Sequence, residues 1–418
     1  MASSCRHTDD KPKVKNVIYL IGDGMGMGAV SSLLLTEEAV TGFEMAPVVG
    51  LSETSSANNH TTDSPAGGTA LATGIRTRNG YLGVDPDGQQ LTSILRKAQA
   101  MGKSTGIVVN TTLTEATPAA FYAGVTSRNM TYDIAKQFTE SGVDLAIGAG
   151  LDDFINRPDS LDLTATLIEK GYEVCLHWES VLNTTSDKFV GILPLGDVHR
   201  RNETDDIEAR AAERDEVCLA AKMAAAAESA DGTHLSEPTV YLEKATSKAL
   251  EVLERNSGKN GFFLMIESAI IDGYGHNNDQ DGLITEMQEF NRTLCQLVEY
   301  VNMHPETLLV VTADHETGGT GITYNTHEVG EQIPLKLIFR TNGHTGTVVP
   351  VFAYGPGAEK RQRCRARKSR FSPFCGRLCD SGQRRSQDFP RWSGSVDNKH
   401  LDHRKRNQTG RHRLLLCF

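Results

Sequence analysis

Short, continuous runs of apolar residues recur along the chain, and each one ends at polar residues. The clearest runs are 17–21, 104–109, 262–266 and 308–311. Runs of this length without polar alternation are typical of strands that are buried on both faces of a parallel sheet. The stretches between them predict helices over 29–38, 64–73, 91–101, 134–141 and 241–254, with Asp133 as the N-cap of the fourth. This alternation predicts an α/β fold, a three-layer α/β/α sandwich with a large, mostly parallel central sheet.

A serine lies where a turn becomes a helix, at Asp63-Ser64-Pro65. Proline suits the first helical turn, because its missing N–H would be unpaired there. Ser64 therefore lies at a helix N-terminus, where free backbone N–H groups and the helix dipole favour an anion. Gly67 and Gly68 follow, and they allow a ligand to come close to the backbone. Taken alone, a serine at this position is more often an N-cap than a nucleophile.

Acidic residues and histidines gather at the ends of three predicted strands. Asp23 follows the first strand, Glu267 follows the run at 262–266, and Asp314 with His315 follows the run at 308–311. In open parallel sheets, ligands bind beyond the carboxyl ends of the strands. A single such residue is usually a turn or cap residue. Three strands that end in this way at one edge favour a metal site instead.

The motifs that carry this chemistry resemble those of the alkaline phosphatase family. They occur in the family's order over roughly residues 15–357, and they are Gly22-Asp23-Gly24-Met25-Gly26, Asp63-Ser64, Glu115-Ala116-Thr117-Pro118, Ser127-Arg128, the stretch from Glu267 to His276, Asp314-His315-Glu316 and Gly343-His344-Thr345-Gly346. The resemblance implies an alkaline-phosphatase-like fold and the hydrolysis of phosphate monoesters, with small phosphomonoesters as substrates.

The resemblance also implies the catalytic groups. Ser64 would attack phosphorus and form a phosphoserine intermediate, which water would then hydrolyse. Arg128 would hold two phosphoryl oxygens with its planar guanidinium, a geometry that lysine cannot reproduce. Without the family context, Arg128 would be read as a surface cation.

Two zinc ions and one magnesium ion are the cofactors that the resemblance implies. One zinc ion would take Asp272, His276 and His344, and the other would take Asp23, Asp314 and His315 and contact Ser64. The i, i+4 spacing of Asp272 and His276 lets both side chains reach one ion if this stretch is helical. Ligands of this kind suit zinc. The magnesium ligands would be Asp23, Thr117, Glu267 and Glu115.

Two positions depart from the family pattern. Glu115 stands where the family usually has aspartate or histidine, and a longer carboxylate can still reach a metal ion or its waters. Gly273 follows the metal-ligand aspartate where lysine, histidine or tryptophan is common, so no side chain there contacts phosphate. These departures bear on metal preference and rate, and the expected reaction class is unchanged.

Charge divides the chain into two parts. The net charge is −10, but residues 359–418 hold 17 Lys and Arg against 5 Asp and Glu. An acidic body does not suggest a nucleic-acid partner. None of the eight cysteines falls in a C-x-x-C spacing, which argues against a cysteine zinc site. No apolar run approaches the length of a membrane span.

These patterns predict three segments. Residues 1–14 are an N-terminal segment that could be the remnant of a leader, 15–358 form the catalytic domain with an insertion at about 150–260, and 359–418 form a basic tail that is disordered or frame-shifted. The family resemblance implies a periplasmic or otherwise extracytoplasmic location, although no leader is visible, and it is compatible with a homodimer.

Two other functions stay open on the sequence. A phosphodiesterase of the same superfamily is one, because the pocket walls decide that choice. An inactive phosphate-binding protein is the other, if the altered C-terminus disables the enzyme. A sulfatase is set aside, because its motif needs Cys or Ser followed by x-Pro-x-Arg, whereas proline directly follows Ser64 and no arginine is near.

Overall fold

The computed structural model describes residues 13–195, 241–323, 335–358 and 414–415. Its centre is a ten-stranded sheet with the order β14-β2-β13-β8-β1-β7-β3-β4-β6-β5. In chain order these strands are β1 (Asn16–Gly22), β2 (Val48–Ser52), β3 (Ser104–Thr112), β4 (Leu145–Ala149), β5 (Glu173–Cys175), β6 (Phe189–Leu193), β7 (Phe262–Ser268), β8 (Thr307–Thr312), β13 (Val349–Tyr354) and β14 (Leu414–Leu415). Two small ladders pair β10 (Gly321–Ile322) with β11 (Leu337–Ile338), and β9 (Glu316–Thr317) with β12 (His344–Thr345).

The sheet is mostly parallel, as predicted. Strands from β8 through β5 run parallel to their neighbours. At the other edge, β13 pairs antiparallel with both β8 and β2, and β14 pairs antiparallel with β2. Parallel strands must be joined by crossovers, and helices supply them here.

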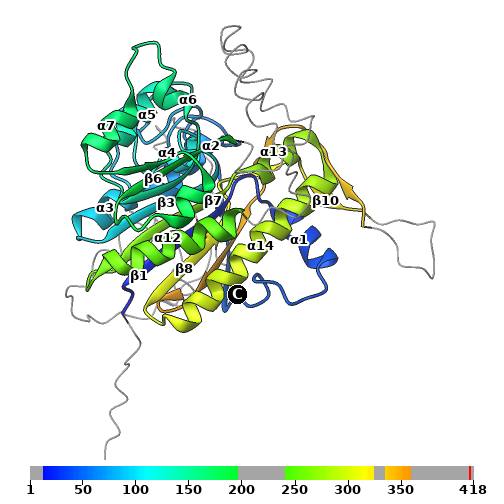
Figure 1. Cartoon of the computed structure of the whole chain (residues 1–418). Helices are drawn as coiled ribbons and strands as arrows, with labels where there is room; N and C mark the ends of the chain where they lie inside the picture. Colours follow the sequence, from blue (N-terminus) through cyan, green and yellow to red (C-terminus); the bar gives the residue numbers. More distant parts are fainter. Residues whose placement is uncertain (1–12, 196–240, 324–334, 359–413, 416–418) are drawn as a thin grey trace, which may run out of the picture.

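Helices cover both faces, which completes the predicted three layers (Figure 1). One layer contains α1 (Met27–Thr36), α8 (Trp178–Asn183), α12 (Tyr241–Ser257), α13 (Ile270–Asn277) and α14 (Gln280–Met303). The other contains α2 (Ser64–Thr73), α3 (Ile94–Ala100), α4 (Ala116–Ala119), α5 (Thr131–Thr139), α6 (Asp152–Ile155) and α7 (Leu163–Glu169). None of the described helices combines the length and the apolar character that a bilayer span requires.

Strand β1 shows why its apolar run is continuous. All of its residues are buried. Ile18 and Leu20 pack into the core beneath α12 and α14, whereas Tyr19 and Ile21 pack into the core beneath α3 and α5. Because successive side chains of a strand point to opposite faces, a strand with a core on each side must be apolar at every position.

The predicted elements exist, and their ends differ by a few residues. Helix α2 spans the predicted residues and ends at Gly74, whose φ of 78° is the left-handed conformation that glycine adopts without strain. Helix α5 begins at Thr131, so Asp133 as its N-cap is wrong. Asp133 lies in the first turn instead, where a negative charge also favours the helix dipole.

The domain boundaries stay predictions. The described parts of the range 150–260 contribute β5, β6 and α12 to the central layers, so the chain returns to the sheet within the expected insertion. Residues 196–240 of the expected insertion lie outside the described residues. The disordered or frame-shifted character predicted for the basic tail also falls outside the described residues. Of this tail, the structure describes only the backbone pairing of β14 with β2.

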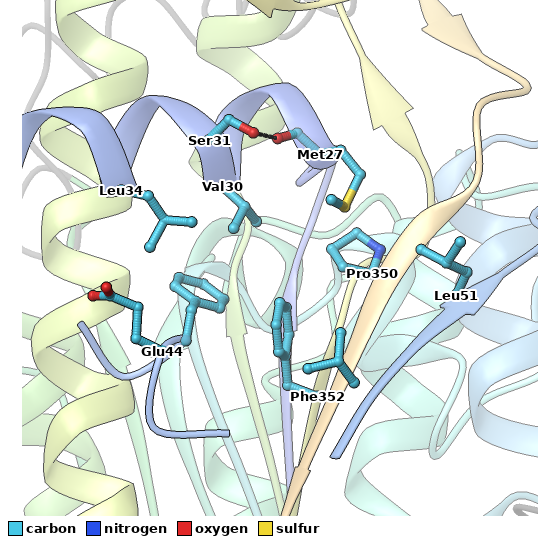
Figure 2. Close-up of a pocket in the computed structure, with 10 residues that line it drawn as sticks. Met27, Val30, Ser31, Leu34, Glu44, Leu51, Pro350 and Phe352 are labelled. Atoms are coloured by element: carbon cyan, nitrogen blue, oxygen red, sulfur yellow. Dashed lines mark hydrogen bonds between the residues drawn. The ribbon is translucent and has the colours of Figure 1, made fainter. Parts of the chain in front are cut away.

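An apolar cavity of about 240 Å³ lies between α1 and the neighbouring strands β2 and β13 (Figure 2). Met27, Leu34 and Phe352 are among its lining residues, and Glu44 is the ionisable residue among them. Its lining includes none of the residues predicted to bind metal or phosphate. A phosphate ester needs cationic and hydrogen-bonding groups, so the polar edge of the sheet is the better candidate for the reaction site.

Candidate metal and phosphate site

The carboxyl ends of three neighbouring strands bring the predicted acidic residues together. Strand β1 lies between β7 and β8, and all three run parallel. Asp23 follows β1, Glu267 lies near the end of β7, and Asp314 follows β8 by two residues. The backbone N–H of Asp23 donates to the carbonyl of Ser268 at 2.9 Å, which holds the ends of β1 and β7 in register. The acidic residues that follow the predicted strands therefore lie at the same end of the sheet.

Ser64 is the first residue of α2 and is 2% exposed. Its N-cap is Asp63, whose Oδ1 accepts the N–H of Ala66 at 3.1 Å and whose Oδ2 accepts the N–H of Gly80 at 2.6 Å. Ser64 itself is therefore free of the capping role. Its Oγ lies 3.2 Å from Nε2 of His315. The hydroxyl thus faces the predicted metal ligands.

The first cluster consists of Asp23, Asp314 and His315, which are all buried. Nε2 of His315 lies 3.4 Å from Oδ1 of Asp23 and 3.1 Å from Oδ2 of Asp314. The other oxygen of Asp314 accepts the N–H of Gly24 at 3.2 Å. Gly24 has a φ of 70°, a conformation that brings its N–H to this carboxylate and that other residues rarely adopt. One oxygen of each carboxylate is left for a cation.

The second cluster consists of Asp272, His276 and His344. Helix α13 carries Asp272 and His276 one turn apart, as their spacing predicts, and Nε2 of His276 lies 3.2 Å from Oδ2 of Asp272. Nε2 of His344 lies 3.5 Å from Oδ1 of Asp272 and 3.1 Å from Nε2 of His276. The rings of His315 and His344 stack with centroids 3.7 Å apart, so the two clusters are in direct contact.

Burial dominates the electrostatics of the carboxylates. Together with Asp314 and Asp272, burial raises the pKa of Asp23 well above its usual value. Burial and Asp272 raise the pKa of Asp314 to about 7. Burial and Asp314 raise the pKa of Glu267 to about 8. Each group needs positive charge nearby to be ionised at neutral pH.

Buried oxygens without hydrogen-bond partners indicate where a positive charge would bind. Oδ1 of Asp23, Oδ2 of Asp314, both carboxylate oxygens of Glu267 and the hydroxyl of Thr117 are buried without a hydrogen-bond partner among the described residues. Buried polar atoms are rarely left unpaired in proteins, and each such atom calls for an explanation such as an ion. Their donor types suit the metals that the resemblance implies.

His315 is in a protonation state that suits metal binding. Burial and His344 hold the pKa of His315 well below its usual value, so its ring is neutral at neutral pH. Burial opposes the charge of Asp272, but hydrogen bonds from His276 and His344 hold the pKa of Asp272 well below its usual value. Asp272 is therefore an anion under the same conditions.

Glu115 and Arg128 form an ion pair at the rim, where both side chains are about a third exposed. Glu115 also caps α4 by accepting the N–H of Ala116 at 3.1 Å. The positive charge of Arg128 lowers the pKa of both Asp23 and Glu267, against the larger effect of burial. The metal role predicted for Glu115 stays a prediction, since the structure pairs it with Arg128.

Residues 14–336 match the family model of alkaline phosphatase. The chain belongs to the alkaline phosphatase family. It resembles alkaline phosphatase 4 of Bacillus subtilis at 28% identity over 84% of this chain and 86% of that protein. It resembles alkaline phosphatase 3 of the same bacterium at 30% identity over 75% of this chain and 63% of that protein. Because the matching family model and these relatives are alkaline phosphatases, the chain is a phosphatase.

Solved structures agree with this assignment. The alkaline phosphatase of the Antarctic bacterium TAB5 superposes with a TM-score of 0.68 and 30% identity, over 84% of this chain and 93% of that chain. Two mutants of the TAB5 enzyme superpose about as well, with one histidine replaced by aspartate or by glutamate. Both have magnesium bound in a site called M3.

Two contacts of this candidate site were not expected from the sequence. The carbonyl of Thr62 lies 3.0 Å from Nδ1 of His344. The hydroxyl of Thr317 donates to Oδ1 of Asp272 and lies 3.2 Å from Nδ1 of His315. A backbone carbonyl leaves no trace in a sequence. Thr317 follows His315 by two residues, but no periodic pattern marks it as part of the site.

Proposed function

We propose that this phosphatase hydrolyses phosphate monoesters through a phosphoserine intermediate on Ser64, with two zinc ions and one magnesium ion. The observation that carries the proposal is the position of Ser64. Its Oγ lies at the N-terminus of α2 and 3.2 Å from His315, beside buried carboxylates that lack partners. A serine with only a structural role at the start of α2 would not need these neighbours.

The residues present fit the implied metals. We propose that Asp272, His276 and His344 hold one zinc ion, and that Asp23, Asp314 and His315 hold the other. His315 also lies within reach of Asp272 and His344, so it borders both sites. When bound, zinc supplies positive charge that favours an ionised nucleophile and stabilises a leaving oxygen.

The magnesium site is proposed on oxygen donors. Glu267 and Thr117 are fully buried with unpaired oxygens, and Asp23 is adjacent to Glu267 at the strand ends. Magnesium prefers such oxygen ligands and keeps several waters. The TAB5 mutant that carries glutamate in place of a histidine binds magnesium in its M3 site. We propose that Glu115 can serve the equivalent site here through its longer side chain.

The protein's own groups then define the reaction. Oγ of Ser64 loses its proton and forms a bond to phosphorus as the bond to the ester oxygen breaks, and the ester oxygen takes up a proton and leaves as the alcohol. The backbone N–H of Ser64 at the start of α2 and the guanidinium of Arg128 bind the phosphoryl oxygens. Glu115 holds the guanidinium in place. Water then attacks phosphorus, releases inorganic phosphate and restores the serine hydroxyl.

We also propose an extracytoplasmic location and homodimer formation, on the family resemblance. Cell fractionation with a tagged chain tests the first. Light scattering on the purified protein tests the second.

One experiment tests the proposed reaction. Purified protein, stripped with a chelator and reloaded with zinc and magnesium, is assayed with an aryl phosphate and with a bis-aryl phosphate. We expect rapid hydrolysis of the monoester and little of the diester. A preference for the diester would identify a phosphodiesterase. Phosphate binding without turnover of either ester would identify an inactive binding protein.

A further inference from the structure

Thr317 contacts residues of both proposed zinc sites, although it is not one of the proposed ligands. It lies in β9, is 2% exposed, and pairs with His344 across the β9–β12 ladder. Its backbone N–H donates to the carbonyl of Gly24 at 3.2 Å, next to Asp23. Its neighbours in space thus belong to four segments that carry proposed zinc ligands.

The hydroxyl of Thr317 makes two contacts of different kinds. It donates to Oδ1 of Asp272, a proposed ligand of one zinc ion. It also lies 3.2 Å from Nδ1 of His315, a proposed ligand of the other. A hydroxyl carries one hydrogen atom but can also accept. Because its hydrogen is used on Asp272, its oxygen accepts the hydrogen of Nδ1 in His315.

This arrangement selects one tautomer of His315. With the hydrogen on Nδ1, the lone pair is on Nε2, which faces Ser64, Asp23 and Asp314. A histidine that binds a metal typically donates its second ring N–H to a fixed partner, and that bond sets the tautomer and the ring orientation. Here a neutral hydroxyl is that partner.

The surrounding backbone leaves space for threonine and little more. A Cβ at Gly24 would lie 2.9 Å from Oγ1 of Thr317, and a Cβ at Gly275 would lie 3.0 Å from its Cγ2. The two glycines therefore let the side chain of Thr317 pack closely on both sides. A well-packed side chain keeps its rotamer, so the hydroxyl stays aimed at both ligands.

We propose that Thr317 is a positioning residue that links the two zinc sites through one hydroxyl, by orienting Asp272 in one site and selecting the tautomer of His315 in the other. The inference rests on the proposed function. Its consequence is that a single hydroxyl deletion weakens zinc binding at both sites.

The test compares three variants of the full chain. Thr317→Val removes the hydroxyl and keeps the shape, and Thr317→Ser keeps the hydroxyl. Thr139→Val is the matched control, because Thr139 is also buried and its hydroxyl also has a partner, the carbonyl of Lys136 at 2.9 Å. Zinc affinity is measured by competition with a chromogenic chelator, and the His315 tautomer by ¹⁵N NMR of the zinc-loaded protein.

We expect Thr317→Val to weaken both zinc sites by about 10- to 100-fold. Thr317→Ser should bind zinc within about threefold of the wild type, as expected when the hydroxyl is the relevant group. The control should be unchanged, and the wild-type spectrum should show the hydrogen on Nδ1 of His315. The inference is overturned if the wild type binds two zinc ions and Thr317→Val binds them equally well, or weakens only one. A spectrum with the hydrogen on Nε2 overturns it too. A wild type that binds no zinc overturns the proposed function instead.

Discussion

Nδ1 of His344 lies 3.0 Å from the backbone carbonyl oxygen of Thr62, two residues before Ser64. The ring N–H donates to this carbonyl, which directs Nε2 toward Asp272 and His276. A proposed zinc ligand is thereby tied to the loop that presents the proposed nucleophile. The same bond aligns the proposed metal site with the Ser64 hydroxyl.

This relationship makes His344→Ala a selective change. We expect it to remove about one zinc ion per chain, because its proposed partners are Asp272 and His276, while the other site keeps its own ligands. Zinc content by elemental analysis, normalised to protein, measures the loss. His304→Ala provides the control, since His304 lies at the end of α14, next to Tyr300 and Glu254. Loss of both ions, or of neither, contradicts the assignment.

Ser64→Ala should lower turnover by about 10³-fold or more and abolish phosphoserine labelling, because the attacking oxygen is gone. Zinc and phosphate binding should persist. The measurement is incorporation of labelled phosphate, followed by peptide mapping. Ser141→Ala is a suitable control, because this buried serine precedes β4 and so lies toward the amino ends of the parallel strands, whereas the candidate site lies at their carboxyl ends. Labelling that survives in Ser64→Ala would assign the nucleophile elsewhere.

Arg128→Ala should weaken competitive inhibition by phosphate about 10- to 150-fold, because a hydrogen bond to a charged group contributes about 1.5–3 kcal/mol. Arg128→Lys should recover little of the loss, since an ammonium cannot hold two oxygens with a planar fork. Arg255→Ala, in which a surface arginine on α12 is removed, should leave the inhibition constant unchanged. An unaltered constant in Arg128→Ala would exclude the phosphate-binding role.

Metal removal should abolish activity, and zinc should restore it better than magnesium alone, because the histidine-containing clusters suit zinc. The assay is aryl phosphate hydrolysis after dialysis against a chelator, with stepwise addition of each metal. Magnesium added after zinc should raise the rate further if Glu267 and Thr117 form the third site. Full activity in a verified metal-free sample is incompatible with the proposal.

The metal-free protein should lose stability as the pH rises from about 6.5 to about 8. In this window Asp314, with a pKa of about 7, and Glu267, with a pKa of about 8, still hold protons in the folded state. Their unfolded forms are already ionised, so the folded state binds more protons and its stability falls with increasing pH. His315 has a lowered pKa and acts in the opposite direction, but only below its unfolded pKa of about 6.5.

Calorimetry in the presence of a chelator measures this trend as a falling melting temperature. The zinc-loaded protein is the control, and its melting temperature should rise over the same window, because metal binding requires ionised carboxylates and competes with protons. A metal-free protein that becomes more stable toward pH 8 would contradict the raised carboxyl pKa values.

Local patterns determined the elements and the chemistry. The continuous apolar run at 17–21 predicted a doubly buried strand, and proline after Ser64 marked the start of α2. The i, i+4 spacing of Asp272 and His276 predicted that they share a helix face, and α13 confirms it. These features depend on residues that are near one another in the chain, so sequence alone can specify them.

Tertiary structure decided which distant groups meet. His344 reaches Thr62 across 282 positions, and Glu115 pairs with Arg128 from a separate loop. The dual contact of Thr317 depends on the packing of β9 against α13 and Gly24. Such contacts follow from the order of the strands and from the packing of side chains that are close in space but distant along the chain. Neither leaves a periodic signal in the residues concerned, because a hydrogen bond depends on atoms within about 3 Å and not on separation along the chain.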